Sequence, residues 1–368
     1  MFYPWGWLLF AAASLVLVSS TMGRYFMKAS PTTVKLDSKE NPEDAYYNIE
    51  PLVDFDLAAE EPIQARPFKP KFHMTMATEN ITLSNLLAMD NTYASRLALR
   101  RSLVATHRPE IIAANPRAAP AITELYAWLT QTYLPTRHPS LYTLTPSGLR
   151  NHTTSTTLPL APTPDAALEH LATNIDTDFL LLLPSSAPAD AGKYRLEAFA
   201  TCFPSGFRTA SKLGLLLADI HGPVPHYRAK LELSMDRFFA ALPVGKIVRR
   251  WNWAVSTTGD LFCVSGNHAT AAQAAAEIQR DEVDLRTTFL RCERQTLHRL
   301  PASRALVFAF KTYQYPIAEV RRDSAREMAE AIDGLGGGSA PEMRVYKREV
   351  VWGEKVKAFL RGEIGEDD

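Results

Sequence analysis

The chain has 368 residues, of which 46% are hydrophobic and 22% are charged. These are ordinary values for globular proteins, and the length suits one large domain or two small ones. The 40 Lys and Arg side chains balance the 40 Asp and Glu side chains, so the overall charge gives no reason to expect nucleic acid or another polyanion as a partner.

The N-terminal segment, residues 1–28, is expected to anchor the chain in a membrane. The stretch from Trp5 to Met22 carries no charge and is close to the shortest length that spans a bilayer. Arg24 and Lys28 follow it, so the positive-inside rule places the folded domain on the cytoplasmic side, for example of the endoplasmic reticulum. The alternative is a cleaved signal peptide, but no basic residue precedes the apolar run and no clean cleavage site follows it.

The cysteines and the glycosylation patterns bear on the compartment. Cys202, Cys263 and Cys292 are odd in number and widely spaced, which fits buried thiols in a reducing compartment better than a disulfide framework. No C-x-x-C pair exists, so a zinc ribbon or an iron–sulfur cluster held by this chain is not expected. Sequons begin at Asn80 and Asn151, and their use would require the lumenal side.

Composition divides the rest of the chain into three parts. Residues 29–47 are acidic and show no sustained period, as expected of a solvated linker. One folded domain is expected over residues 48–330. Residues 331–368 contain three consecutive glycines at 336–338 and are expected to be a glycine-rich linker and a C-terminal tail, with a short helix near 351–361.

Helices come first in the expected domain and strands come later. Apolar spacing predicts helices over 83–108, where Pro109 helps to end the helix, and over 122–133 and 164–173. Short apolar or alternating runs predict a hairpin of strands at 179–183 and 194–200. Further strands are predicted at 251–255, 289–298 and 305–313, and the alternation of charged and apolar residues over 289–298 is typical of a half-exposed strand. Further helices are predicted at 229–242 and 324–335, and the Ala-rich stretch at 269–278 is expected to be a helix or a mobile insert.

The predicted fold class is α+β, with N-terminal helices, a mainly antiparallel sheet and helices packed on that sheet. Turns rather than regular crossover helices separate the strands, which favours antiparallel pairing. The common catalytic patterns are absent: the sequence contains no G-x-x-x-x-G-K-[ST] loop, no G-x-S-x-G elbow and no H-E-x-x-H.

One loop of the predicted domain contains residues suited to binding a metal or a cofactor. His221 stands before Gly222 and Pro223, and Pro225 stiffens the same loop. A stiff loop that presents an imidazole suits a haem or metal ligand, and a glycine would let a flat macrocycle approach. The alternative is a loop histidine bonded to a backbone carbonyl. Three cations of this segment could pair with carboxylates such as haem propionates: Arg208, Lys212 and Arg228.

A second segment, residues 291–301, is dense in charged residues that alternate with other types. On a strand, Arg291, Glu293 and Gln295 share one face, and Arg294 and Thr296 share the other. Either row could line a polar cavity. The alternative is a solvated outer face with cross-strand ion pairs.

Together these segments resemble the haem-dependent oxidative N-demethylase-like family, and the resemblance spans roughly residues 48–330. An upstream block also looks similar. The matching residues are Phe72-x-Met74-x-Met76, Asp90-x-x-Tyr93, Arg100-Arg101, Lys212-Leu213-Gly214, Ile220-His221-Gly222-Pro223-Val224-Pro225, Asn252-Trp253, Arg291-x-Glu293-Arg294-Gln295-Thr296-Leu297-x-Arg299-Leu300-Pro301-x-Ser303 and Phe310-x-Thr312-Tyr313.

The resemblance implies a PAS-like domain that holds haem b non-covalently. It implies a monooxygenase that uses O2 to remove a methyl group from a small secondary amine as formaldehyde, with electrons from separate flavin and iron–sulfur components. His221 would be the axial iron ligand, and Lys212, Arg208, Gly222 and Pro223 would surround the cofactor. Glu293 would accept a hydrogen bond from the protonated amine. Arg291, Gln295 or Tyr313 would position oxygen or substrate.

Two other functions stay open at this point. One is a haem-based sensor without turnover, and the other is a haem-free scaffold of the same fold. The anchor, a Pro- and Thr-rich loop and an Ala-rich insert at 267–280 set this chain apart from the family's enzyme pattern. Because function resides in the site rather than in the fold, the resemblance alone does not decide between these functions.

Overall fold

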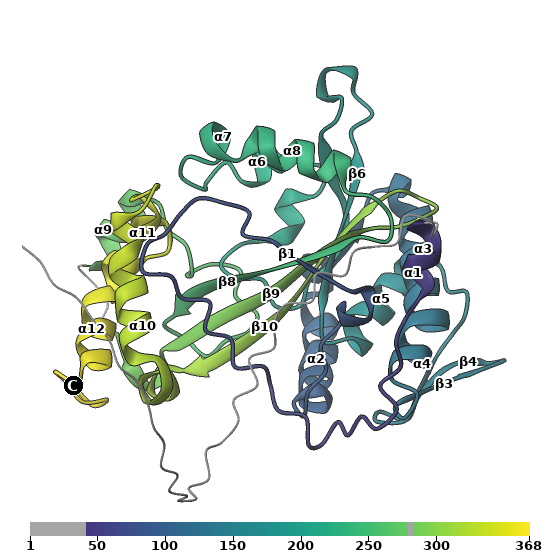
Figure 1. The fold of residues 1–368 in the computed structure, drawn as a ribbon, viewed down its shortest axis with the longest axis horizontal. Helices are drawn as coiled ribbons and strands as arrows, with labels where there is room; N and C mark the ends of the chain where they lie inside the picture. The colour runs from purple at the N-terminus through teal and green to yellow at the C-terminus, as the bar shows by residue number, and fades with distance from the viewer. Residues whose placement is uncertain (1–41, 279–282) are drawn as a thin grey trace, which may run out of the picture. The chain divides into compact units, whose positions relative to one another are not determined.

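A seven-stranded sheet forms the centre of the fold (Figure 1). The computed structural model describes residues 42–278 and 283–368. All strand pairs are antiparallel, in the order β1-β8-β9-β10-β6-β7-β2. The strands are β1 (Glu79–Ile81), β2 (Ile112–Ala114), β6 (Asp178–Pro184), β7 (Tyr194–Ala200), β8 (Ile247–Ser256), β9 (Phe289–Arg299) and β10 (Leu306–Pro316). A small second sheet contains β3 (Tyr142–Thr145), β4 (Gly148–Asn151) and β5 (Thr156–Leu158).

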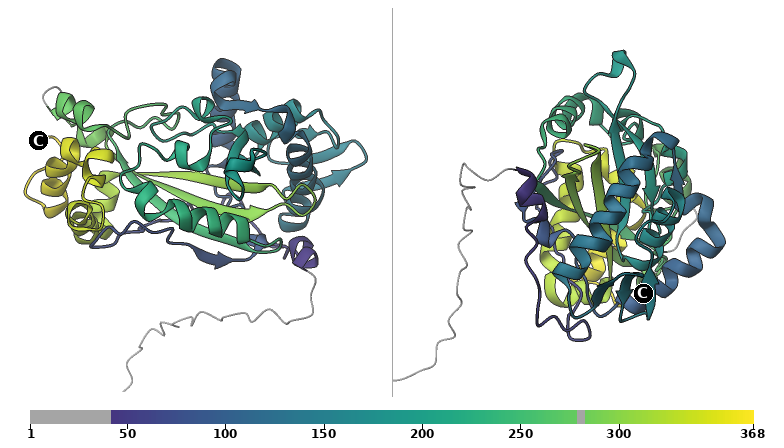
Figure 2. Two further views of the ribbon diagram at one scale, coloured as in Figure 1. Left: turned by 90° about the horizontal axis from the view of Figure 1, so that it is seen from above. Right: turned by 90° about the vertical axis from the view of Figure 1, so that its right-hand side faces the viewer.

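Helices surround the central sheet on both faces and at its ends (Figures 1 and 2). They are α1 (Pro42–Tyr47), α2 (Tyr93–Ile111), α3 (Ala119–Trp128), α4 (Leu134–Arg137), α5 (Pro164–Asn174), α6 (Leu217–Ile220), α7 (Tyr227–Lys230), α8 (Glu232–Ala241), α9 (Ala271–Ile278), α10 (Ile317–Gly337), α11 (Met343–Tyr346) and α12 (Glu349–Arg361). The mixed helix and antiparallel sheet confirms the predicted α+β class. The hairpin of β6 and β7 and the helix α5 also confirm their predictions.

The two faces of the sheet meet different layers. Val248, Leu297 and Leu306 project to one face and pack in one cluster with Met235 and Phe239 of α8; this face is called the α8 face below. Residues one step along each strand project to the opposite face. There they pack against α2, α3 and α5 at one end of the sheet, and against α10 and α12 at the other. The sheet is therefore covered on both sides.

This cover overturns one expectation for residues 289–298. The alternation of charged and apolar residues predicted a half-exposed strand, and a solvated outer face was the alternative to a polar cavity. In the structure β9 is a central strand, and Arg291, Glu293 and Arg294 are all buried. The charged residues therefore mark polar contacts inside the protein, where buried charges require partners.

The predicted helix over 83–108 is two elements. Residues 83–85 form a single 3-10 turn, and α2 begins only at Tyr93. The Asp90 side chain accepts a hydrogen bond from the backbone N–H of Thr92 at 3.1 Å, which makes a turn before the helix. The backbone is non-helical at His107, so Pro109 follows a kink and α2 continues to Ile111.

The C-terminal region is part of the fold rather than a linker and a tail. Trp352 and Val356 of α12 are fully buried against α10. Two glycines near the end of α10 permit close contact with the chain at 70–72. A Cβ atom would lie 2.3 Å from the Pro70 carbonyl oxygen at Gly334, and 1.7 Å from the Phe72 carbonyl oxygen at Gly338. These glycines therefore serve close packing.

The predicted anchor and most of the predicted acidic linker lie outside the described residues. Within 42–278 and 283–368, no helix is long and apolar enough to cross a bilayer. The end of the predicted linker already packs on the domain, because Tyr46 of α1 is fully buried. Of the two sequon asparagines, Asn80 is exposed, whereas Asn151 is buried and donates to the Tyr93 hydroxyl at 3.0 Å.

Candidate functional site

His221 ends the short helix α6 and has a fixed ring orientation. Its Nδ1 lies 2.8 Å from the Leu217 carbonyl oxygen, which can only accept, so Nδ1 carries the proton. The ring stacks on Tyr227 with centroids 4.5 Å apart and planes 11° apart. Burial lowers the pKa of His221 to about 4, so the ring is neutral at pH 7.

This arrangement leaves the other ring nitrogen available. No described residue hydrogen-bonds Nε2 of His221, and the side chain keeps part of its surface accessible. Metal-bound histidines commonly donate from one nitrogen to a carbonyl while the other binds the metal. The two alternatives for His221 are therefore compatible: Nδ1 bonds to a backbone carbonyl, and Nε2 stays available to bind the haem iron. Across the described ranges, no three His, Cys, Asp or Glu side chains gather as a metal-binding group.

Glu293 lies on the α8 face of β9 and has one free oxygen. Its Oε2 accepts hydrogen bonds from Gln295 Nε2 at 2.8 Å and from Asn252 Nδ2 at 3.3 Å. Asn252 is the cross-strand neighbour of Glu293 on β8. No hydrogen bond to Oε1 is found within the described part of the chain. The carboxylate is therefore oriented by two amides and can accept a further donor.

Two cations near Glu293 have no anionic partner. Arg250 is the cross-strand neighbour of Gln295, and its Nε is buried without a hydrogen bond. Lys212 lies over the Phe207 ring, with Nζ 3.7 Å from the centroid. Neither side chain has an ion pair or a hydrogen bond within residues 42–278 and 283–368. Burial lowers the pKa of Lys212 to about 8, and nearby Glu293 opposes that shift.

Lys212 and Arg250 are both partly buried, and cations withdrawn from water without partners are unfavourable, so this pair of side chains calls for an anion. Burial also lowers the pKa of Arg250, again against the effect of Glu293. Both cations lower the pKa of His221, which places all three groups within electrostatic range of one another. The predicted cofactor residue Lys212 thus lies near His221 and Glu293, and Arg250 joins them.

Arg291 holds two loop segments against the sheet. It shares the α8 face with Glu293, but its guanidinium donates to four carbonyl oxygens at 2.8–3.3 Å. These belong to Phe203, Pro204, Asp260 and Leu261. Only Nε is left without a partner. The side chain therefore ties the 203–204 and 260–261 segments to the sheet.

The remaining predicted site residues lie at the margin or on the other face. Arg208 is exposed and pairs with Glu110 at 3.1 Å. Arg228, also exposed, pairs with Asp219 at 3.3 Å. Gly222 and Pro223 are exposed in the turn after His221. Tyr313 pairs in register with Cys292 and so faces away from Glu293, and its buried hydroxyl has no hydrogen bond in the part of the chain that the structure describes. The structure does not bring these residues together with Glu293.

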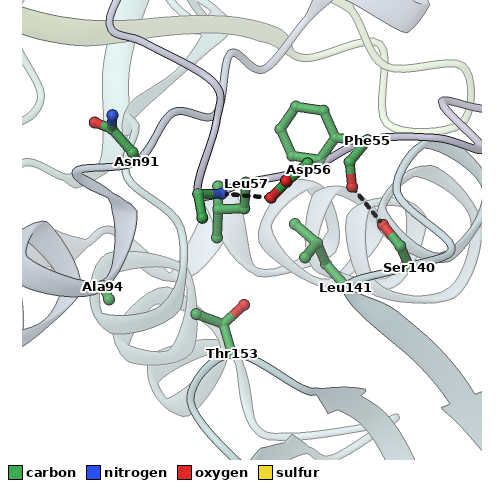
Figure 3. A pocket seen from close by; sticks show the side chains of 9 residues that line it. Phe55, Asp56, Leu57, Asn91, Ala94, Ser140, Leu141 and Thr153 are labelled. Carbon is green, nitrogen blue, oxygen red and sulfur yellow. Dashed lines mark hydrogen bonds between the residues drawn. The ribbon is translucent and has the colours of Figure 1, made fainter.

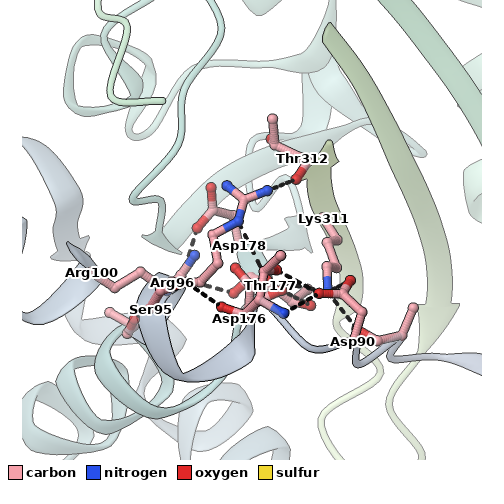
Figure 4. Close-up of polar contacts among 12 residues, drawn as sticks. Asp90, Ser95, Arg96, Arg100, Asp176, Thr177, Asp178, Lys311 and Thr312 are labelled. Atoms are coloured by element: carbon pink, nitrogen blue, oxygen red, sulfur yellow. Dashed lines mark hydrogen bonds and ion pairs between the residues drawn. The ribbon is translucent and has the colours of Figure 1, made fainter. Parts of the chain in front are cut away.

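A buried ionic network fixes the start of the loop that covers the α8 face (Figure 4). Asp178, at the beginning of β6, pairs with Arg100 at 2.8 Å. The same carboxylate accepts from the backbone N–H groups of Cys202 and Phe203, each at 2.8 Å. Nearby on the opposite face, Lys311 pairs with Asp90 at 2.6 Å and with Asp176 at 3.2 Å. Asp178 thus connects helix α2 to the segment that leads to Lys212 and His221.

Three residues that interact with the site lie in segments for which the sequence predicted no functional role. Lys347 and Tyr346 belong to the region predicted as a tail, and Glu293 is among the groups that shift the pKa of each. His268 lies in the Ala-rich insert and contacts the Tyr346 ring in a tilted arrangement, with centroids 4.5 Å apart. Only the pairing of β8 with β9 could have revealed Arg250 from the sequence. No sequence signal links the other three to Glu293.

Two surface hollows lie apart from these residues. One, of about 510 Å³, is lined by residues that include Phe55, Asp56, Ser140 and Leu141 (Figure 3). Its only charged side chain, Asp56, accepts from the Ala58 N–H at 2.9 Å. The other, of about 540 Å³, is lined by residues of α2, β5 and α5. Neither contains a predicted site residue.

Comparison with known proteins bears on the whole region. A model of the family described as haem-dependent oxidative N-demethylase, alpha subunit-like, matches residues 77–357, which is well over half of the chain. The matched range contains His221, Glu293 and Arg250. It also contains Tyr346 and Lys347, so it extends into the C-terminal region beyond residue 330.

Proposed function

Because the chain belongs to the haem-dependent oxidative N-demethylase, alpha subunit-like family, we propose that it binds haem b non-covalently and demethylates a small secondary amine. The family is haem-dependent, so a haem cofactor follows at the family level. The observation that carries the proposal is the His221 ring: neutral, held through Nδ1–H and free at Nε2. This is the state that an axial ligand needs.

The surrounding residues fit a haem. Haem b carries two propionate carboxylates, and the site offers two cations, Lys212 and Arg250, that form no ion pair within residues 42–278 and 283–368. Charge-assisted hydrogen bonds to these carboxylates would satisfy Nε and the other unbonded groups of Arg250. Arg250 is a better candidate than Arg208 for binding a propionate, because Arg208 already pairs with Glu110. His221 would hold the iron.

When bound, the haem supplies activation of O2. Overall, an N-methyl amine, O2, two electrons and two protons give the demethylated amine, formaldehyde and water. The electrons would come from a separate reductase, since the sequence contains no nucleotide or cluster motif. A membrane anchor at residues 1–28 would keep the domain close to membrane-bound reductases.

Glu293 would bind the substrate amine. Its free Oε1 can accept a hydrogen bond from the protonated nitrogen, while Asn252 and Gln295 hold Oε2 in place. A positioned carboxylate orients the methyl group and favours one binding pose. Arg291 contributes indirectly, because it holds the segments that cover this face of the sheet.

The test is amine-dependent turnover by the full-length, haem-loaded protein. With a chemical or enzymatic reductant, oxygen uptake and formaldehyde release should rise when a secondary methylamine is added. The Glu293→Gln variant should keep haem and lose most of the amine-dependent rate. Haem binding without amine-dependent oxygen uptake would contradict the demethylase proposal and indicate a sensor, and a folded protein without haem would indicate a scaffold.

A further inference from the structure

We propose that the amine substrate also carries a carboxylate, as an N-methylated amino acid does, and that Lys347 binds this carboxylate. The inference rests on the proposed function, because it assigns the substrate class of the same site. It comes from a surplus of positive charge around Glu293, part of it fully buried, which a simple alkylamine would increase.

Lys347 is a buried cation close to Glu293. The side chain is 4% exposed, and its ammonium donates to the Trp253 carbonyl oxygen. Trp253 follows Asn252 on β8, and Asn252 donates to Glu293. The Lys347 ammonium is therefore held at the β8 backbone next to Asn252, although the Trp253 side chain itself projects to the face opposite Glu293. Glu293 and Arg250 both influence the pKa of Lys347, which confirms that the three groups lie within electrostatic range.

The ammonium of Lys347 has no anion beside it. No ion pair to Lys347 is found in the described ranges, and the Trp253 carbonyl accepts only one of its three N–H groups. The Trp253 ring lies 5.1 Å from the nitrogen, which offsets part of the charge but offers no hydrogen-bond acceptor. Tyr346, beside it in the chain, forms no hydrogen bond through its hydroxyl within the same ranges. Donors for a small carboxylate are thus present.

A count of charges decides between substrate classes. Lys212, Arg250, Arg291 and Lys347 are cationic, and Glu293 is the one acidic side chain that affects the pKa of all four within the described residues. The Arg291 guanidinium is already held by four backbone carbonyl oxygens, so the charges to be balanced are those of the other three cations. Two haem propionates would balance two of the cations. A protonated alkylamine on Glu293 would then leave Lys347 unbalanced in a buried place, which is costly. A zwitterion satisfies Glu293 with its ammonium and Lys347 with its carboxylate.

The experiment compares two matched ligands on the full-length, haem-loaded protein. N-methylglycine carries the carboxylate, and N-methylglycinamide has nearly the same shape without that charge. Binding is measured by calorimetry. We expect N-methylglycine to bind at least about tenfold more tightly than the amide, as a buried charge-assisted hydrogen bond implies.

Variants assign the preference to Lys347. Lys347→Gln keeps a donor for the Trp253 carbonyl and should remove the preference for the acid, whereas Lys347→Arg keeps the charge and should restore it. Circular dichroism and haem content establish that each variant is folded. Equal binding of the two ligands, tighter binding of the amide or no binding of either would overturn the inference.

Turnover separates this inference from the proposed function. Oxygen uptake with dimethylamine but not with N-methylglycine would overturn the substrate assignment and leave the demethylase proposal standing. No uptake with any amine, or no haem, would overturn both.

Discussion

The Asp178→Asn substitution tests how the covering loop is held over the sheet. Asp178 is 1% exposed and makes three contacts at 2.8 Å, with Arg100 and with the backbone N–H groups of Cys202 and Phe203. Asparagine keeps one acceptor oxygen, so at least one contact loses its partner and Arg100 loses its anion. Removing one member of a buried ion pair costs about 3–5 kcal/mol. That is a large share of a total stability of roughly 5–15 kcal/mol.

The assay is urea unfolding followed by circular dichroism at pH 7. Asp323→Asn is the matched control, because Asp323 pairs with Arg66 at the same distance of 2.8 Å but its side chain is 49% exposed. An exposed pair contributes at most about 1 kcal/mol. If Asp178→Asn costs no more than Asp323→Asn, then the buried network does not hold the loop and the reasoning from burial is wrong.

Three further predictions concern single side chains. His298 is fully buried, neither ring nitrogen has a hydrogen-bond partner among the described residues, and burial lowers its pKa from 6.5 to about 3. Below about pH 6.5 the imidazole is protonated in the unfolded chain but stays neutral in the folded chain, so the unfolding free energy of the unmodified chain falls as the pH falls. His298→Phe removes this effect. The unfolding free energy of the variant relative to the unmodified chain should therefore be about 2 kcal/mol higher at pH 5 than at pH 8, measured by urea titration at both values. Arg250→Leu should weaken haem binding at least about tenfold in a haem titration, whereas the exposed Arg208→Leu should change it little. Gly334→Ala should destabilise the protein by about 1–3 kcal/mol because its Cβ would meet a backbone oxygen, whereas Gly337→Ala, in the same helix with open space around it, should be neutral or slightly stabilising by thermal unfolding.

The sequence predicted the sheet better than its surroundings. Strands 194–200 and 289–299 were visible because local alternation and turn residues define them. Alternation cannot tell whether the second face meets water or protein, so β9 was expected to be half-exposed. The break before α2 depends on a hydrogen bond from the Thr92 N–H to the Asp90 side chain, which apolar spacing does not reveal.

The C-terminal region shows a similar limit. Three consecutive glycines usually indicate a flexible linker. Here Gly336 and Gly337 continue α10, and Gly334 and Gly338 admit the backbone at 70–72. That contact joins segments more than 260 residues apart, so only the tertiary structure could show it.

The candidate site was predictable where its residues are adjacent in sequence. His221, Lys212 and Glu293 came from dense motifs, and their roles as haem and substrate ligands remain predictions. Arg291 and Arg208 were chosen for their charge, but charge alone does not show which protein groups already occupy a guanidinium. Lys347 lies 54 residues beyond Glu293 in the sequence. Its ammonium is held by the Trp253 carbonyl oxygen, a contact that the sequence does not reveal.

Haem binding through His221 is tested most simply by the visible absorption spectrum of the full-length protein after incubation with haem. Three forms are compared: the unmodified chain, His221→Ala, and His226→Ala as a control, because His226 is exposed and pairs with Glu342. We expect a Soret band at one haem per chain, lost or strongly shifted in His221→Ala and unchanged in His226→Ala. A Soret band of unchanged position and intensity in His221→Ala would contradict the assignment of His221 as the iron ligand.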